Sequence, residues 1–152
     1  IISGQIINQV NDALATTGIS PESLEIELTE TTLMQQTEKT IATLNQLREL
    51  GVTISIDDFG TGYSSLSYLK TLPIQTIKID RSFVSGMEEG KEGMVDVLIH
   101  ISRMHGLTII AEGVENEFQR EFLLSKGCHL GQGYLFSRPV PFDDFVHYIQ
   151  NY

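Results

Sequence analysis

The stretch VTISIDDFGTGYSS, residues 52–65, places an apolar run directly before two acids and a glycine-rich turn. Four other apolar runs also end on a residue that can hold a metal ion or a reacting water. They are LEIELTE with Glu27, TIKID with Lys78, LTIIAEG with Glu112 and HLGQGY with Gln132. Enough chain for a helix lies between successive runs, and this rhythm of β-α units predicts a parallel sheet.

The carboxyl ends of parallel strands lie at one edge of a sheet, so these polar residues are expected to meet there. The fold class is therefore α/β, in one of two forms. A complete (β/α)8 barrel needs about 250 residues, whereas this chain has 152 residues and five predicted strands. It is either an open doubly wound sheet or the later five-eighths of a barrel.

The individual elements are read from apolar periodicity and from the glycine and proline positions that end them. We expect strands over 24–29, 52–56, 74–79, 107–111 and 130–136, and helices over 4–17, 36–50, 64–71, 92–104, 115–126 and 142–149. The helix over 115–126 is expected to turn Phe118, Phe122 and Leu123 inward. Residues 86–93, with three glycines and three glutamates, are predicted to form an exposed loop.

The composition limits the class of partner and the compartment. A net charge of −10, from 20 acids and 10 bases, disfavours duplex nucleic acid, whose phosphates would be repelled. The single cysteine, Cys128, cannot form an internal disulfide and suits a reducing cytoplasm. No apolar run approaches the roughly 20 residues of a membrane span, so no membrane contact by this segment is expected. The chain begins without a methionine, so we expect it to be a piece of a longer protein.

Asp57 and Asp58 form the sharpest local signal. Two adjacent acids at the end of an apolar strand raise each other's pKa unless a cation neutralises them. Successive strand residues point to opposite faces, so one acid is expected to reach inward and the other over the rim. Such a pair can serve two metal ions. The alternative is a solvated strand end at which Asp58 caps the following turn.

The glycine-rich stretch FGTGYSS, residues 59–65, has two possible interpretations. Its backbone N–H groups and hydroxyls can fold over a phosphate before a helix N-terminus. It can equally be a turn in which Ser64 caps the next helix. The candidate binding residues of this stretch are Gly60, Thr61, Gly62, Tyr63 and Ser64.

Lys78 lies between two isoleucines in the run TIKID. A lysine at the end of a buried strand needs an anion or a metal-bound hydroxide, because an unpaired buried charge is costly. It can therefore polarise a water or hold a phosphate oxygen. The structural alternative is a salt bridge to Asp57 or Asp80, and Asp80 is otherwise a supporting partner of Lys78.

The last two strands add four more candidates. Glu112 is expected to point into the pocket as a metal ligand or general base. Glu115, at the start of the next helix, either takes part in the site or stabilises the helix dipole. Gln132, between two glycines, suits a water or substrate oxygen. Arg138 can hold a phosphate bidentately or pair with a surface acid. No pair of histidines has zinc-site spacing.

Five motifs now stand in a fixed order: ELTE, DDFGTGYSS, KIDRSFV, AEGVE and QGYLFSRP. This ordered set closely resembles the EAL domain family from about Ser3 to the C-terminus. The resemblance implies a (β/α)8 barrel and a bacterial phosphodiesterase that opens cyclic di-GMP to linear pGpG. It also implies two Mg²⁺ or Mn²⁺ ions, a homodimer, and upstream regulatory or sensory domains in a parent protein that can be membrane-anchored.

The resemblance also assigns roles to residues. Glu27 and Asp57 resemble ligands of one metal, and Asp57 and Asp58 resemble ligands of the second. Lys78 resembles the lysine that contacts the hydrolytic water, and Glu112 a general base or metal-site residue. The remaining matches are Gln132, which resembles the glutamine of the last strand, and Glu115, which resembles the glutamate that anchors residues 59–65.

The family's Glu-Ala-Leu motif and the asparagine of the following strand do not occur in this sequence. Residues 1–152 are therefore expected to be the C-terminal part of a single EAL-type domain, a partial barrel of about five βα units lacking the N-terminal strands. Alone, it is expected to show weak or no activity, and to pair with itself through its open edges. The alternatives are a non-catalytic cyclic di-GMP receptor and, ranked low, a phospho-receiver domain.

Overall fold

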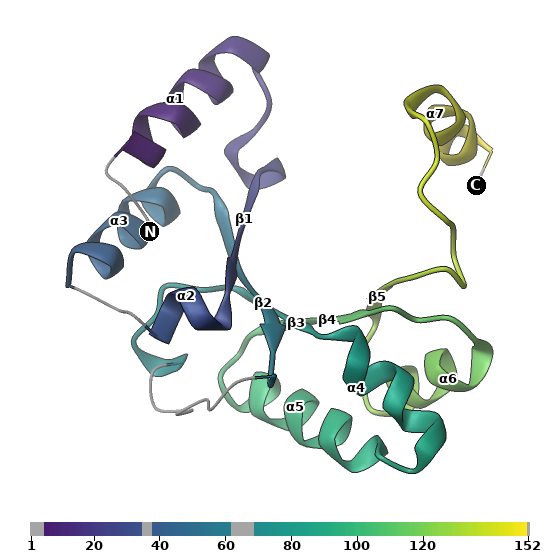
Figure 1. Cartoon of the computed structure of the whole chain (residues 1–152). Helices are drawn as coiled ribbons and strands as arrows, with labels where there is room; N and C mark the ends of the chain where they lie inside the picture. Colours follow the sequence, from purple (N-terminus) through teal and green to yellow (C-terminus); the bar gives the residue numbers. More distant parts are fainter. Residues whose placement is uncertain (1–4, 35–37, 62–68, 152) are drawn as a thin grey trace.

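The structure is a computed structural model, and it describes residues 5–34, 38–61 and 69–151. Five parallel strands form one sheet, and each strand pairs with the next one along the chain. Figure 1 shows this curved sheet at the centre of the molecule. The strands are β1 (Glu25–Thr29), β2 (Thr53–Phe59), β3 (Thr76–Ile79), β4 (Thr108–Glu112) and β5 (Leu130–Gln132).

Helices connect and follow these strands. In the part of the chain that the structure describes, they are α1 (Gln5–Thr17), α2 (Glu30–Met34), α3 (Glu38–Glu49), α4 (Arg81–Gly86), α5 (Glu92–Met104), α6 (Glu117–Ser125) and α7 (Phe142–Gln150). Short 3-10 turns lie at Pro21–Ser23 and Met87–Glu89. None of the described helices combines the length and apolar character that a membrane crossing requires.

The strand order decides between the two predicted α/β forms. A doubly wound sheet reverses its order at a switch point, and a receiver-type sheet has the order 2-1-3-4-5. Here the order is β1-β2-β3-β4-β5, without reversal. Winding in one direction builds a barrel wall, so the partial (β/α)8 barrel is confirmed. The doubly wound sheet and the phospho-receiver alternative are wrong.

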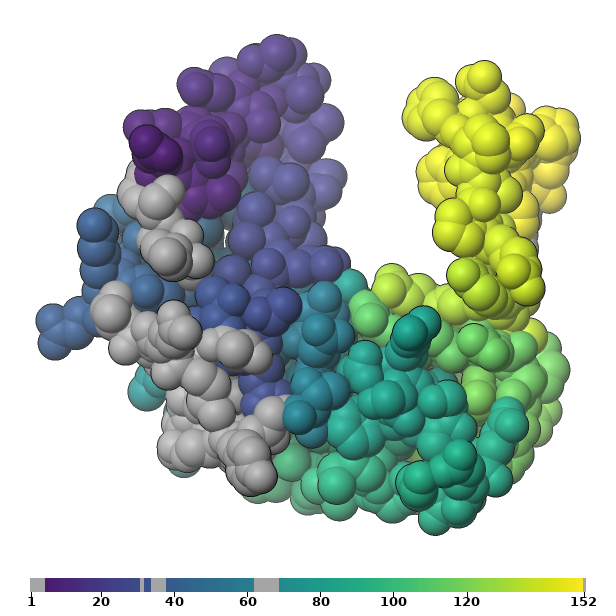
Figure 2. Space-filling view, in the orientation of Figure 1, coloured from purple at the N-terminus to yellow at the C-terminus, as the bar shows by residue number. Residues whose placement is uncertain are grey.

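The two faces of the sheet differ in chemistry. The outer face is apolar and buried, with Ile54, Ile56, Ile77 and Ile79 all fully covered. Helices α3 and α5 pack on this side and contribute buried leucines and isoleucines to the same core. The inner face carries polar residues, of which Ser55, Thr76 and Lys78 are buried. Figure 2 shows a broad hollow between the N-terminal part of the chain and α7.

Several predicted boundaries change in the structure. The last strand ends at Gln132 rather than near residue 136, and β2 extends to Phe59. The sequence reading missed α4, whose N-cap is Asp80. The stretch over 86–93 is not a wholly exposed loop, because Met87 is buried. The helix predicted over 64–71 lies mostly outside the described residues.

The prediction for the inward residues of α6 is partly wrong. Leu123 is buried and Phe122 packs against the core, but Phe118 is half exposed. Gln119 takes the buried position on this helix instead. Its side-chain oxygen accepts a hydrogen bond from the backbone N–H of Glu115 at 2.7 Å. A polar side chain can occupy a buried position when it satisfies a backbone group in this way.

Candidate active site

The centre of the site is the amine of Lys78, which lies between two glutamates. Its Nζ is 2.7 Å from Oε1 of Glu27 and 2.7 Å from Oε1 of Glu112. Lys78 comes from β3, Glu27 from β1 and Glu112 from the end of β4. Side chains from three strands therefore converge at one place, as the common edge of a parallel sheet predicts.

The electrostatics of this group favour a charged lysine. The Lys78 side chain is only 8% exposed, whereas those of Glu27 and Glu112 are 48% and 17% exposed. Burial acts to lower the pKa of the Lys78 amine, but hydrogen bonds to Glu112 and Glu27 outweigh it and raise that pKa. The predicted alternative was a salt bridge from Lys78 to Asp57 or Asp80. It is wrong, because the salt bridges of Lys78 are to Glu27 and Glu112.

Gln132 holds Glu112 from the other side. Its side-chain N–H donates to Oε1 of Glu112 at 2.7 Å, and the two residues are register partners on β4 and β5. One carboxylate oxygen thus accepts from both the lysine and the glutamine. The second oxygen of Glu112 is the one oriented for other chemistry, because its partner oxygen is held at two points.

Asp57 and Asp58 lie in a bulge of β2. Ile56 pairs with Ile77 and Phe59 with Ile79, so three steps on β2 match two on β3. Asp58 absorbs the extra residue with φ of 54°, a conformation that aspartate adopts more readily than most residues. The backbone N–H of Asp58 donates to Oδ1 of Asp57 at 3.0 Å. A bulge of this kind re-aims side chains, so simple alternation does not describe this pair.

The surroundings of Asp58 disfavour the ionised form of its carboxyl group. Burial, the charge of Asp57 and the carboxyl of Asp80 raise the pKa of Asp58, and Lys78 only partly offsets them. Asp80 itself accepts from the backbone N–H of Ser82 at 3.0 Å and caps α4. Although desolvation opposes it, this hydrogen bonding lowers the pKa of Asp80. Asp80 therefore caps a helix rather than supporting Lys78.

The raised pKa of Asp58 predicts that Asp58→Asn stabilises the metal-free protein. The folded state holds this proton more tightly than the unfolded state, so stability falls as pH rises through the pKa of Asp58. Asparagine removes that fall and tolerates a positive φ. We expect a gain of roughly 0.5 kcal/mol at neutral pH, the scale of partly exposed charge interactions.

The measurement is thermal unfolding in a chelator from about pH 4 to about pH 7, the range in which carboxyl groups of raised pKa titrate. Asp80→Asn is the matched control and is expected to destabilise, because the pKa of Asp80 is lowered rather than raised. A lower melting temperature for Asp58→Asn at neutral pH would contradict the prediction.

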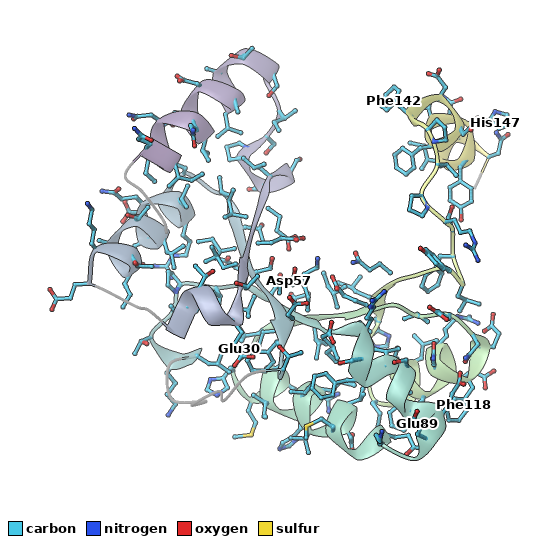
Figure 3. The ribbon with its side chains drawn as sticks, viewed as in Figure 1. Glu30, Asp57, Glu89, Phe118, Phe142 and His147 are labelled. Carbon is cyan, nitrogen blue, oxygen red and sulfur yellow. The ribbon has the colours of Figure 1, made fainter. Side chains whose placement is uncertain are left out.

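Glu30 is a site residue that the sequence reading missed. It begins α2 directly after β1, is only 2% exposed, and accepts a hydrogen bond from the backbone N–H of Gly60 at 3.0 Å. It thereby holds Gly60, at the start of the glycine-rich stretch that follows the acid pair, and Figure 3 labels Glu30 and Asp57. The signal was the second acid of ELTE.

The glycine-rich stretch is only partly described. Thr61 donates from its hydroxyl to the backbone oxygen of Asp58 at 2.9 Å, which closes the turn after the acid pair. Gly62, Tyr63 and Ser64 lie outside the described residues. The anchoring role that the resemblance gives to Glu115 stays a prediction, while the described contact to this stretch comes from Glu30.

A cavity of about 560 Å³ lies next to Glu112 and Gln132. Glu115 and Arg138 are on its wall, and so is Arg81, which the sequence reading missed although it follows the KID motif directly. The guanidinium of Arg138 stacks 4.6 Å from the ring centre of Tyr134. Two arginines beside two glutamates make this cavity suited to a ligand that carries phosphate groups.

The acids of the site fit a hard divalent cation by their chemistry, because Mg²⁺ and Mn²⁺ prefer carboxylate oxygens. Within the described part of the chain, however, no three acidic, histidine or cysteine side chains lie close enough together to hold one ion. The amine of Lys78 lies between Glu27 and Glu112 instead. The four candidate ligands, Glu27, Asp57, Asp58 and Glu112, therefore lie on β1, β2 and β4, and two of them pair with Lys78.

A protein-family model described as the EAL domain matches residues 2–139 of this chain. This match spans the strands, the acid pair and the lysine. The chain belongs to the EAL domain family. The expected resemblance is thus confirmed.

Named relatives agree with this membership. The cyclic di-GMP phosphodiesterase NbdA of Pseudomonas aeruginosa is 43% identical over 149 residues, which is 97% of this chain and 19% of that protein. The chain thus spans about a fifth of the length of this curated relative.

Two solved structures share the EAL fold with this chain. The PaMucR phosphodiesterase in complex with c-di-GMP is 42% identical with a TM-score of 0.88, over 93% of this chain and 58% of that one. The manganese and cyclic di-GMP complex of Klebsiella pneumoniae BlrP1 at pH 9.0 is 34% identical with a TM-score of 0.81, over 90% of this chain and 36% of that one.

Proposed function

We propose that the protein carrying this EAL domain hydrolyses cyclic di-GMP to linear pGpG. The observation that carries the proposal is the convergence of Glu27, Lys78 and Glu112 from three strands, beside the acid pair Asp57 and Asp58. The names of the relatives NbdA and PaMucR support this substrate. Phosphodiester cleavage needs a water activated at neutral pH and neutralised phosphate oxygens, and this set of residues can serve both.

The roles divide between the strands. Glu112 is the general base or a metal ligand, and Lys78 and Gln132 hold it in position. Lys78 also orients the attacking water. Arg81 and Arg138 border the adjacent cavity and would hold the phosphates of the substrate. Glu30 keeps the glycine-rich stretch in place beside the acid pair.

Two Mg²⁺ or Mn²⁺ ions are proposed as cofactors, held by Glu27, Asp57, Asp58 and Glu112. When bound, such ions neutralise phosphate charge and lower the pKa of a coordinated water. The manganese complex of the BlrP1 structure supports this choice of metal. The carboxylates supply oxygen ligands, which both ions prefer.

We further propose that the 152-residue chain alone has little activity. Within the described residues, β1 and β5 each pair on one side only, so the barrel is open where the site needs a wall. Unpaired parallel edges also favour self-association, and we propose a homodimer in the parent protein. The low coverage of NbdA supports a longer parent protein, in which we propose upstream regulatory or sensory domains. A cytoplasmic location remains our proposal.

The test is hydrolysis by the full-length protein. With Mn²⁺ or Mg²⁺ we expect conversion of cyclic di-GMP to pGpG, and with a chelator we expect none. Asp57→Asn is expected to lower the rate at least about 100-fold, since it removes a ligand of the catalytic centre. Asp12→Asn, on the exposed face of α1, is the control and is expected to retain full activity. A metal-loaded protein without turnover would reject the proposal.

A non-catalytic receptor is the second candidate. The observation in its favour is that the Lys78 amine pairs with both Glu27 and Glu112, two of the proposed metal ligands. A receptor would bind cyclic di-GMP equally well in chelator and in Mn²⁺, and would show no product. Calorimetric titration of the full-length protein under both conditions separates the two candidates.

A further inference from the structure

Ser55 is unusual among the residues that the structure describes. Its side-chain oxygen is the one buried side-chain nitrogen or oxygen found there without a hydrogen-bond partner, and the residue is 0% exposed. Unpaired buried hydroxyls are rare, and each one calls for a physical cause. The functions assigned above leave this hydroxyl unused.

The strand register places Ser55 under the active site. It pairs with Glu27 on β1 and with Thr76 on β3. Paired residues of parallel strands share a face, and residues two apart on one strand also share it. Ser55 therefore lies on the inner face, level with Glu27 and diagonal to Lys78.

The path of the Lys78 side chain brings it near Ser55. Lys78 starts on β3 and its amine contacts Glu27 on β1, while β2 lies between these two strands. The side chain must therefore cross β2 on the inner face, where Ser55 and Asp57 are. Diagonal neighbours on a sheet are within reach of a long side chain. The Lys78 side chain thus runs over the face of β2 on which Ser55 lies.

The donors of Lys78 create a problem when a cation binds. An ammonium group has three donors, and Glu27 and Glu112 account for two of them. When one of these carboxylates turns toward a metal ion, its hydrogen bond from the Lys78 amine is weakened or lost. A buried ammonium that loses an acceptor pays a large penalty unless another acceptor replaces it.

We propose that Ser55 is a positioning residue that accepts a hydrogen bond from Lys78 when a divalent cation engages Glu27. In the metal-free protein the Ser55 hydroxyl is buried and has no hydrogen-bond partner. In the loaded protein it keeps the amine on the inner face, beside the reacting water. This inference deepens the proposed function and rests on its metal site.

The proposal predicts opposite effects of Ser55→Ala on two properties. The metal-free protein becomes slightly more stable, because an unpaired buried hydroxyl is removed. Affinity for Mn²⁺ falls about tenfold, the lower end of effects measured for partners of metal-site residues. If Ser55 served only in packing, Ser55→Ala would not raise the stability of the metal-free protein while lowering its Mn²⁺ affinity.

The experiment uses the full-length protein with Mn²⁺ alone as the probe. Thermal unfolding in chelator measures the first effect, and calorimetric titration with Mn²⁺ measures the second. Ser102→Ala is the matched control, because Ser102 is also a buried serine but its hydroxyl donates to the Leu98 oxygen at 2.9 Å. It is expected to lower stability and leave Mn²⁺ affinity unchanged. Ser55→Thr keeps a hydroxyl and is expected to retain most of the affinity.

The outcomes are distinct. Unchanged Mn²⁺ affinity in Ser55→Ala overturns the inference. So does a loss of affinity from Ser55→Ala that is equally large in the Lys78→Met background, because such a loss would not depend on the lysine. A tenfold loss in Ser55→Ala that disappears in the Lys78→Met background supports it. If Mn²⁺ binds and responds to Ser55 but cyclic di-GMP is not hydrolysed, the proposed function fails while this inference stands.

Discussion

Lys78→Met in the full-length protein is expected to lower the rate of cyclic di-GMP hydrolysis at least about 100-fold, the usual scale for a residue that positions a reacting proton. Methionine keeps the length of the side chain but removes the cation. Glu27 and Glu112 then face each other without the amine that now lies 2.7 Å from both. The general base loses its orientation, and the attacking water loses a donor.

The same change is expected to destabilise the metal-free protein by about 2 kcal/mol, because it leaves a largely buried carboxylate unpaired while solvent screens the half-exposed one. The raised pKa of Lys78 makes this contribution complete at neutral pH. It is lost only as pH rises through that raised pKa. Urea unfolding at neutral pH measures the stability, and a product assay with Mn²⁺ measures the rate.

A second lysine of the chain provides the matched control. Lys91 pairs with Glu89, but both side chains are about two-thirds exposed. Lys91→Met is therefore expected to leave both stability and hydrolysis essentially unchanged, because water screens so exposed a pair. Addition of Mn²⁺ is expected to reduce the stability loss of Lys78→Met without restoring its activity. Full activity of Lys78→Met would remove the lysine from the mechanism.

Gly133→Ala is expected to destabilise the domain by about 3 kcal/mol or more, because overpacking and broken backbone hydrogen bonds act together. A β-carbon at this position would lie 2.2 Å from the oxygen and 2.3 Å from the nitrogen of Val114. Both atoms belong to the backbone, so no side chain can move aside. Val114 also accepts from Leu135 and donates to Gln132, each at 3.0 Å, and the alanine would separate these groups.

The effect extends to catalysis, because Gln132 precedes the glycine and holds Glu112. Denaturant unfolding and the hydrolysis assay together check this prediction. Gly93→Ala is the control, since nothing lies within 4 Å of a β-carbon there and the residue is in α5. It is expected to gain roughly 0.5–1 kcal/mol from helix propensity. Equal stability of Gly133→Ala and the parent would show that the segment near Val114 adapts freely.

Much of the architecture could be predicted from local patterns. Apolar periodicity found the helix over 92–104 without error and placed all five strands, because side-chain spacing along an element is a local property. The predictions were wrong where contacts between distant segments decide which side chain is buried. Phe118 is half exposed while Gln119 is buried, because Gln119 satisfies a backbone N–H that periodicity does not register.

The sequence predicted most residues of the candidate site, but not which of them pair with each other. Strand ends of a parallel sheet share an edge, so Glu27, Lys78 and Glu112 were expected together, and both glutamates contact Lys78. Glu27, however, lies in the middle of β1 and not at its end. The partners of Lys78 could not be predicted, because they depend on the path of its side chain across β2. Glu30 was missed for a similar reason, since its partner is a backbone N–H thirty residues away.

The sequence by itself determined the family, the parallel α/β architecture and the set of polar residues at the strand ends, because ordered motifs and periodicity are written along the chain. Only the tertiary structure decided the barrel-type strand order, the bulge at Asp57 and Asp58, and the unpaired hydroxyl of Ser55. The physical reason is that strand register and side-chain reach arise between segments distant in sequence. Neither can be read from one segment alone.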